Sequence, residues 1–208
     1  MPKKQLFMNM IMPNKMYIQS NYNFRWKFQY IPSYYEGISE EQKQINNIVL
    51  DFKNGVTNED TMSWFCRTIW NITKKDDYSW SVCFMPCSSI ETHKIRFGRI
   101  AEYLKENTRV DVYLSTYGFI NEHSPSHKEG KSEINKNDIA VNVEHIYNKN
   151  VILIDDVVTT GKTFNAVANM TMFAGARSVL GLFLAKTIHP RHLKKISGMT
   201  AKEAEDLI

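Results

Sequence analysis

The stretch Val151–Thr163, VILIDDVVTTGKT, decides the fold. Its first four residues, Val151–Ile154, are all apolar, which is typical of a strand that is buried on both faces in a parallel sheet. Two adjacent carboxylates, Asp155 and Asp156, follow this strand. Open α/β sheets bind their ligands outside the carboxyl ends of the strands. We therefore expect a binding site at the two aspartates.

The loop after the carboxylates has the composition of a phosphate-binding loop. Gly161 permits a tight turn with positive φ, and successive backbone N–H groups at a helix N-terminus favour an anion. Asp155 and Asp156 would repel a second phosphate, but carboxylates accept hydrogen bonds from vicinal hydroxyls. This chemistry predicts a sugar phosphate whose diol lies on the aspartates. The residues predicted to hold its phosphate are Thr159, Thr160, Gly161, Lys162 and Thr163.

Three other interpretations of this segment fit less well. A nucleotide-binding P-loop needs a glycine five residues before Gly161, and that residue is Asp156. A simple turn at the end of a strand does not account for two adjacent carboxylates followed by a threonine-glycine loop. A receiver-like phosphorylation site can use an acidic pair, but the loop that follows does not suit it.

The flanking sequence alternates between strand and helix patterns, which indicates an open, mainly parallel α/β sheet flanked by helices. The N-terminal part contributes a strand over Phe24–Ile31, a helix from Ser39 to Gly55 and a second helix beginning near Thr57. The remaining strands are expected at Ser79–Pro86, Val110–Ser115 and Ser178–Thr187, and the remaining core helices at Glu91–Lys105 and Thr163–Ala174.

Periodicity also predicts which side chains these helices bury. On the helix over Glu91–Lys105 the expected buried stripe is Ile95, Ile100, Ala101 and Leu104. On the second N-terminal helix Met62, Phe65, Ile69 and Ile72 share one face. Trp64 and Trp70, on the same helix, are expected to serve packing and not to form a platform for stacking bases.

Composition limits the classes of protein. The 208 residues, 43% of them hydrophobic, suffice for one core, and the net charge of +4 suits a small anionic ligand as well as nucleic acid. Apolar runs are far shorter than the roughly 20 residues of a membrane span, so no membrane partner is expected. Three cysteines do not make a disulfide framework, which favours a reducing, cytoplasmic setting.

The segment Val151–Thr163 closely resembles the signature of type I phosphoribosyltransferases. The resemblance implies a parallel-sheet core with a small variable hood, and phosphoribosyl pyrophosphate as the ligand together with Mg²⁺. It places the ribose hydroxyls on Asp155 and Asp156 and the 5′-phosphate on Thr159–Thr163. No direct metal ligand is assigned, since Mg²⁺ would be held through the ligand and water near the two aspartates.

Two further elements follow from the resemblance. A loop that contacts the pyrophosphate is expected at Cys87, Ser88 and Ser89, where a helix begins; an ordinary helix cap at Ser88 or Ser89 is a compatible interpretation. A mobile lid is expected in the polar stretch from Gly118 to Asn137, where Lys128 would neutralise the leaving pyrophosphate.

The resemblance is strongest to competence-F-type proteins of this family, on Pro86, Ile95-Arg96-Phe97, the lysine-containing lid and DDVVTTG. The cysteine-rich zinc segment that many of those proteins carry is absent here, and their lid arginine is also missing. Thr159 stands where enzymes for 6-oxopurines usually have aspartate, which argues against hypoxanthine or guanine as the acceptor.

We therefore expect one phosphoribosyltransferase-like domain over residues 1–208, with about 1–55 as hood or accessory part and about 56–190 as core. The expected activity is transfer of a 5-phosphoribosyl group to a nitrogenous small-molecule acceptor with release of pyrophosphate. The alternative is a non-catalytic regulatory or DNA-uptake protein that binds phosphoribosyl pyrophosphate. Nucleic acid is not the expected partner, although the sequence leaves it open, as it does a homodimer.

Overall fold

The main sheet is open and all-parallel, with five strands in the order β2-β8-β7-β3-β4. The computed structural model describes residues 7–8, 22–74, 78–119 and 139–189. The strands of this sheet are β2 (Phe24–Tyr30), β3 (Trp80–Phe84), β4 (Asp111–Tyr113), β7 (Asn150–Val158) and β8 (Ser178–Thr187). The expectation of an open, mainly parallel sheet is confirmed.

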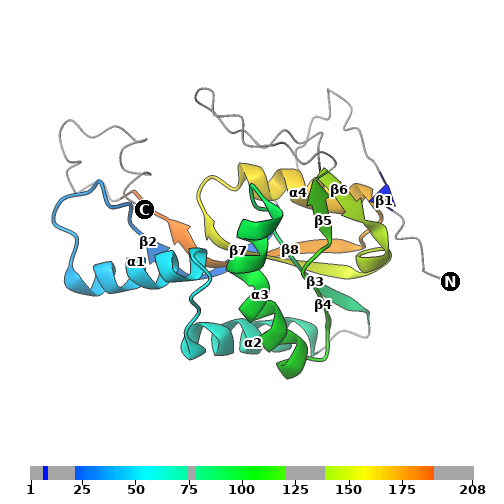
Figure 1. The fold of residues 1–208 in the computed structure, drawn as a ribbon, viewed down its shortest axis with the longest axis horizontal. Helices are drawn as coiled ribbons and strands as arrows, with labels where there is room; N and C mark the ends of the chain where they lie inside the picture. Colours follow the sequence, from blue (N-terminus) through cyan, green and yellow to red (C-terminus); the bar gives the residue numbers. More distant parts are fainter. Residues whose placement is uncertain (1–6, 9–21, 75–77, 120–138, 190–208) are drawn as a thin grey trace.

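Helices cover both faces of the main sheet (Figure 1). They are α1 (Glu40–Lys53), α2 (Glu59–Thr73), α3 (Ile90–Asn107) and α4 (Lys162–Phe173). The predicted cap at Ser39 is present, because its side chain accepts a hydrogen bond from the Gln42 backbone N–H. Gly55 follows the end of α1 with φ of 83°. None of the described helices is long and apolar enough to cross a membrane.

The strands bury alternate side chains in two separate cores, as the pleat of a strand requires. Ile152 and Ile154 of β7 belong to the core that includes Phe52 of α1, Phe65 of α2 and Phe97 of α3. The second core lies against the opposite face of β7 and includes residues of α4. Because β7 is covered on both faces, its apolar run has no exposed positions, and the sequence prediction of a central strand is confirmed.

A second sheet, not anticipated from the sequence, is antiparallel and has the strand order β1-β6-β5. Its strands are β1 (Phe7–Met8), β6 (Ile139–Asn142) and β5 (Tyr117–Phe119), and a short 3₁₀ helix, Val143–His145, follows β6. Tyr117 and Val141 join the core on the α4 side of the main sheet. β5 occupies the first residues of the stretch expected as a lid, and residues 120–138, with Lys128, lie outside the described part.

Two expected burials are wrong. Ile95 is 56% exposed, and α3 instead turns His93 and Phe97 toward the core along with Ile100, Ala101 and Leu104. Trp70 is 49% exposed, whereas Trp64 does pack against the core. On each helix another apolar residue is fully buried instead: Phe97 on α3 and Ile69 on α2.

Gly181 of β8 is required by the packing of three aromatic rings. An added Cβ there would lie 2.6 Å from the Phe183 ring and 2.8 Å from Phe164 and from the Cβ of Phe24. These rings pack edge to face, with centroids 5.3–6.0 Å apart, and they join β2, α4 and β8. A side chain at Gly181 would therefore displace these rings and disturb the packing of β8, the strand that lies between β2 and β7.

We expect Gly181→Ala to lower the free energy of unfolding by about 1–3 kcal/mol, because overpacking a tight core displaces side chains. Urea denaturation followed by circular dichroism measures the change. Gly98→Ala is the matched control: it lies inside α3, a Cβ there meets nothing within 4 Å, and it should gain roughly 0.5–1 kcal/mol. Equal stability of the two variants would contradict the packing argument.

Candidate functional site

The site lies where the direction of the chain connections reverses. From β3 the chain runs through α3 to β4 on one side, and from β7 it runs through α4 to β8 on the other side. α3 and α4 contribute to different cores, so they lie on opposite faces of the sheet. The loops that leave adjacent strands β3 and β7 therefore diverge and open a crevice at their carboxyl ends.

The acidic pair belongs to the end of β7 and does not lie beyond it. β7 was predicted as Val151–Ile154 but continues to Val158, paired with β8 through Asp155↔Phe183 and Val158↔Lys186. The carboxylates also hold the backbone locally, since Asp155 Oδ1 accepts from the Asp156 N–H at 2.9 Å and Asp156 Oδ1 accepts from the Val157 N–H at 2.7 Å. Both side chains are largely buried, with Asp155 20% and Asp156 11% exposed.

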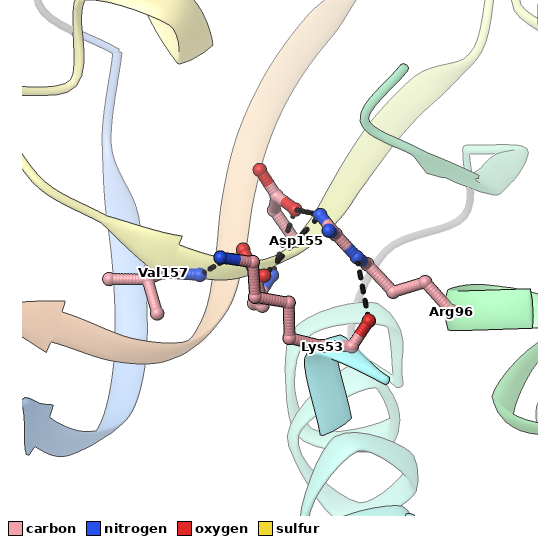
Figure 2. A network of polar contacts seen from close by, with 5 residues as sticks. Lys53, Arg96, Asp155 and Val157 are labelled. Carbon is pink, nitrogen blue, oxygen red and sulfur yellow. Dashed lines mark hydrogen bonds and ion pairs between the residues drawn. The ribbon is translucent and has the colours of Figure 1, made fainter. Parts of the chain in front are cut away.

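Arg96 of α3 pairs with both carboxylates. It is one of the residues that carry the family resemblance, but the sequence did not predict this contact. Its Nη1 lies 3.3 Å from Asp156 Oδ2 and 3.9 Å from Asp155 Oδ1, and its Nε donates to the Lys53 carbonyl oxygen at 3.3 Å (Figure 2). Figure 2 also shows the Lys53 side chain extending toward β7 near Val157. The last residue of α1 and the second turn of α3 thus converge on the acidic pair.

Burial and repulsion act together on Asp155. Loss of solvent, and then the neighbouring Asp156, raise the pKa of Asp155 well above its ordinary value, and Arg96 opposes this in part. The two carboxylates and one guanidinium therefore form a group in which like charges are held close together at low exposure. Such an arrangement lowers stability and is typical of a site kept for binding or chemistry.

The phosphate loop has the expected geometry. Gly161 precedes α4 with φ of 75°, a left-handed conformation, and no side chain caps the helix. α1, α2 and α3 by contrast all have a side-chain cap, on Ser39, Asn58 and Ser89. The first backbone N–H groups of α4 are consequently open to an anion.

A cavity of about 130 Å³ lies beside this loop and Asp155. Its lining includes Asp155 and the loop residues Thr159, Gly161, Lys162 and Thr163, but not Asp156. The structure thus brings together one aspartate and four of the five residues predicted to hold the phosphate. Thr160 is not among the lining residues; its hydroxyl lies 3.5 Å from the Lys162 N–H.

The segment after β3 follows the helix-cap interpretation. Ser89 caps α3, since its Oγ accepts from the Thr92 N–H at 3.0 Å. Burial raises the pKa of the Cys87 thiol to about 11, which disfavours a reactive thiolate at neutral pH. The charge of Arg96 lowers this pKa, and the charges of Asp155 and Asp156 raise it. All three cysteines are unpaired, as expected.

Comparison with known proteins finds similar solved structures but no matching family or curated protein. No model of a known protein family matches the chain, and no curated protein is similar to it. Among solved structures, a hypoxanthine-guanine phosphoribosyltransferase from Bacillus anthracis is similar, with 15% identity and a TM-score of 0.38 over 71% of this chain and 76% of that one. A hypoxanthine phosphoribosyltransferase from Staphylococcus aureus has 16% identity and a TM-score of 0.36 over 70% and 71%.

The structure titled the allosteric regulatory enzyme of purine biosynthesis is also similar, with 14% identity and a TM-score of 0.40 over 76% of this chain and 37% of that one. At this identity the likeness concerns the arrangement of strands and helices. What the site binds has to be argued from its own residues.

The acidic pair gives a stability test. Because the pKa of folded Asp155 lies above its unfolded value, its contribution is fully present below the unfolded pKa and is lost as the pH rises through the folded one. We expect Asp155→Asn to raise the free energy of unfolding at pH 7 by about 1–2 kcal/mol, and to lose this advantage near pH 3. Thermal unfolding over this pH range measures it. Asp51→Asn, an exposed change on α1, is the control, and a destabilised Asp155→Asn at pH 7 would contradict the argument.

Proposed function

We propose that this chain is a phosphoribosyltransferase that binds phosphoribosyl pyrophosphate at the carboxyl ends of β3 and β7 and transfers its 5-phosphoribosyl group to a nitrogenous acceptor. The main support is the cavity between Asp155 and the uncapped N-terminus of α4. It offers carboxylate acceptors for a diol on one side and backbone donors for a phosphate on the other. A phosphorylated sugar matches both halves.

In the proposed reaction the bond from the anomeric carbon to pyrophosphate breaks as a bond to the acceptor nitrogen forms. Positive charge develops on the sugar ring in the transition state. The residues of this chain would act mainly through position and charge. The loop holds the 5′-phosphate, Asp155 and Asp156 hold the ring hydroxyls, and their negative charge lies close to the ring where positive charge develops.

Arg96 would keep the acidic pair compatible with an anionic ligand. Two carboxylates alone would repel phosphate groups, and the guanidinium 3.3 Å from Asp156 offsets one of the two charges. Arg96 lies on α3, and the pyrophosphate is proposed to lie at the start of this helix. Arg96 is a described cation beside the acidic pair, in addition to Lys162 of the loop.

Mg²⁺ fits the proposed site only as an ion that arrives with the ligand. The described residues contain no cluster of three or more groups able to hold a metal, but oxygen donors are available on Asp155 and Asp156. Diphosphate oxygens and water would complete its coordination. When bound, the ion would offset charge on the leaving pyrophosphate.

Calorimetric titration of phosphoribosyl pyrophosphate with Mg²⁺ tests the proposal. We expect a Kd on the order of micromolar. Asp155→Asn/Asp156→Asn should weaken it about a hundredfold or more, because two charge-assisted hydrogen bonds are lost. Asp51→Asn should bind as the wild type does. If the wild type does not bind at millimolar ligand, the proposal fails. A screen of nitrogenous acceptors for pyrophosphate release then separates a transferase from a regulatory protein that only binds.

Removal of the Arg96 guanidinium should weaken the binding of phosphoribosyl pyrophosphate in the same titration. We expect Arg96→Gln to raise the Kd for phosphoribosyl pyrophosphate about tenfold, the effect of losing one charge-assisted contact. Arg99→Gln is the matched control, because Arg99 is an exposed arginine of the same helix and the change in net charge is identical. Equal affinities of the two variants would remove Arg96 from the site.

A further inference from the structure

A second cavity, of about 540 Å³, lies at the opposite end of the main sheet from the acidic pair. Its floor includes Trp80 and Asp111, which are the first residues of β3 and β4. Trp80 pairs with Asn150, five residues before Asp155 on β7, so the two sites lie about 16 Å apart along the strand direction. The proposed phosphoribosyl pyrophosphate site therefore does not account for this cavity.

The walls are the carboxyl-terminal ends of two helices. α2 contributes Trp70 and Lys74, and the turn after α3 contributes Thr108 and Arg109. A volume of about 540 Å³ lies within the usual range for small-molecule sites, roughly 300–1,000 Å³.

Aromatic rings with cations over them surround the opening. Trp70 is 49% and Tyr78 56% exposed, although large aromatic side chains are usually buried. The Arg109 guanidinium carbon lies 5.8 Å from the Trp70 ring centroid, and that of Arg177 lies 4.0 Å from Tyr78. Trp70 and Tyr78 thus share one pattern, an exposed ring at the cavity with an arginine over it.

The charge at the cavity favours an anion. Lys74 and Arg109 line it, and the carboxylate among the described lining residues, Asp111, is already paired with Lys149 at 2.7 Å. The carboxyl-terminal ends of α2 and α3 carry partial negative charge, which Lys74 and Arg109 offset. A cationic ligand would be repelled by Lys74 and Arg109. Flat aromatic surfaces beside positive side chains instead suit a nucleobase that carries a phosphate.

We propose that this second cavity binds a nucleoside monophosphate, with its base against Trp70 and its phosphate near Arg109 and Lys74. The site is separate from the one that would bind phosphoribosyl pyrophosphate and does not require that function. The cavity lies at the amino ends of β3 and β4. The carboxyl end of β3 leads into the first site, so a nucleotide bound in the cavity would contact a strand that both sites share.

The experiment is a calorimetric titration of AMP into Asp155→Asn/Asp156→Asn, in which the proposed ribose contacts of the first site are weakened. We expect AMP to bind this variant, and adding Arg109→Gln or Trp70→Ala to weaken it about tenfold or more. Ribose 5-phosphate, which lacks the base, should bind much more weakly than AMP. The matched controls are Trp26→Ala, which removes a 40% exposed tryptophan with Lys186 over its ring at 4.8 Å, and Arg99→Gln.

Absence of AMP binding at millimolar concentration would overturn the proposal, as would binding that neither Trp70→Ala nor Arg109→Gln weakens. Arg109 is exposed, so its substitution leaves the core intact, and thermal unfolding verifies that each variant is folded. Tighter binding of single-stranded oligodeoxyadenylate than of AMP would overturn the assignment to a free nucleotide. Wild-type binding of phosphoribosyl pyrophosphate is scored separately, so failure of one proposal does not decide the other.

Discussion

The constraint on which the rest of the structure depends is the placement of two carboxylates on consecutive residues at the buried end of β7. Asp155 and Asp156 lose solvent there and repel each other, so the surrounding chain must supply compensation. Arg96 provides a charge, and the backbone N–H groups of Asp156 and Val157 provide hydrogen bonds. The Lys53 carbonyl in turn holds Arg96, so the end of α1 and the start of α3 are fixed by the same group. The acidic pair and Arg96 thus connect β7 to both helices, which also pack together through Phe52 and Phe97.

The topology turns this local arrangement into an opening for a ligand. β3 and β7 are adjacent and parallel, but the helices that follow them cross on opposite faces. A chain that continued on one face would have covered the carboxyl ends with α3 or α4. Here the helix N-termini diverge, and the loop at Gly161 is left bordering a cavity with Asp155. The uncapped start of α4 is stable in this position only where something else satisfies its N–H groups, water or an anion.

The sequence predicted the elements whose signals are local. β8 has the bounds that its apolar run indicated, and the left-handed glycine before α4 was expected from the loop composition. The sequence did not predict β5 and β6, which are three and four residues long and acquire their structure from pairing with each other. On α3, periodicity correctly predicted that Ile100, Ala101 and Leu104 are buried, but it included Ile95 and omitted Phe97. Ile95 and Phe97 both offer apolar surface, and the sheet and α1 select Phe97, which packs on Phe52 and Phe84. The contact between Arg96 and the acidic pair depends on α3 turning Phe97, and not Ile95, toward the core, so it was not predicted either.

The exposed Trp70 and the buried Arg96 depart from the sequence pattern in opposite directions. A tryptophan on an amphipathic helix is expected inside, and an arginine outside, because these placements stabilise a fold most. Each departure lies at a proposed site at one end of the main sheet: Arg96 pairs with the acidic pair at the carboxyl ends, and Trp70 lines the cavity at the amino ends. Positions that depart from local rules without a gain in stability are expected at sites of function. The middle of the sheet, in contrast, has apolar residues at buried positions, as expected: Ile152, Leu153 and Ile154 are fully buried. Sequence and burial therefore agree best in the part of β7 that lies between the two proposed binding sites.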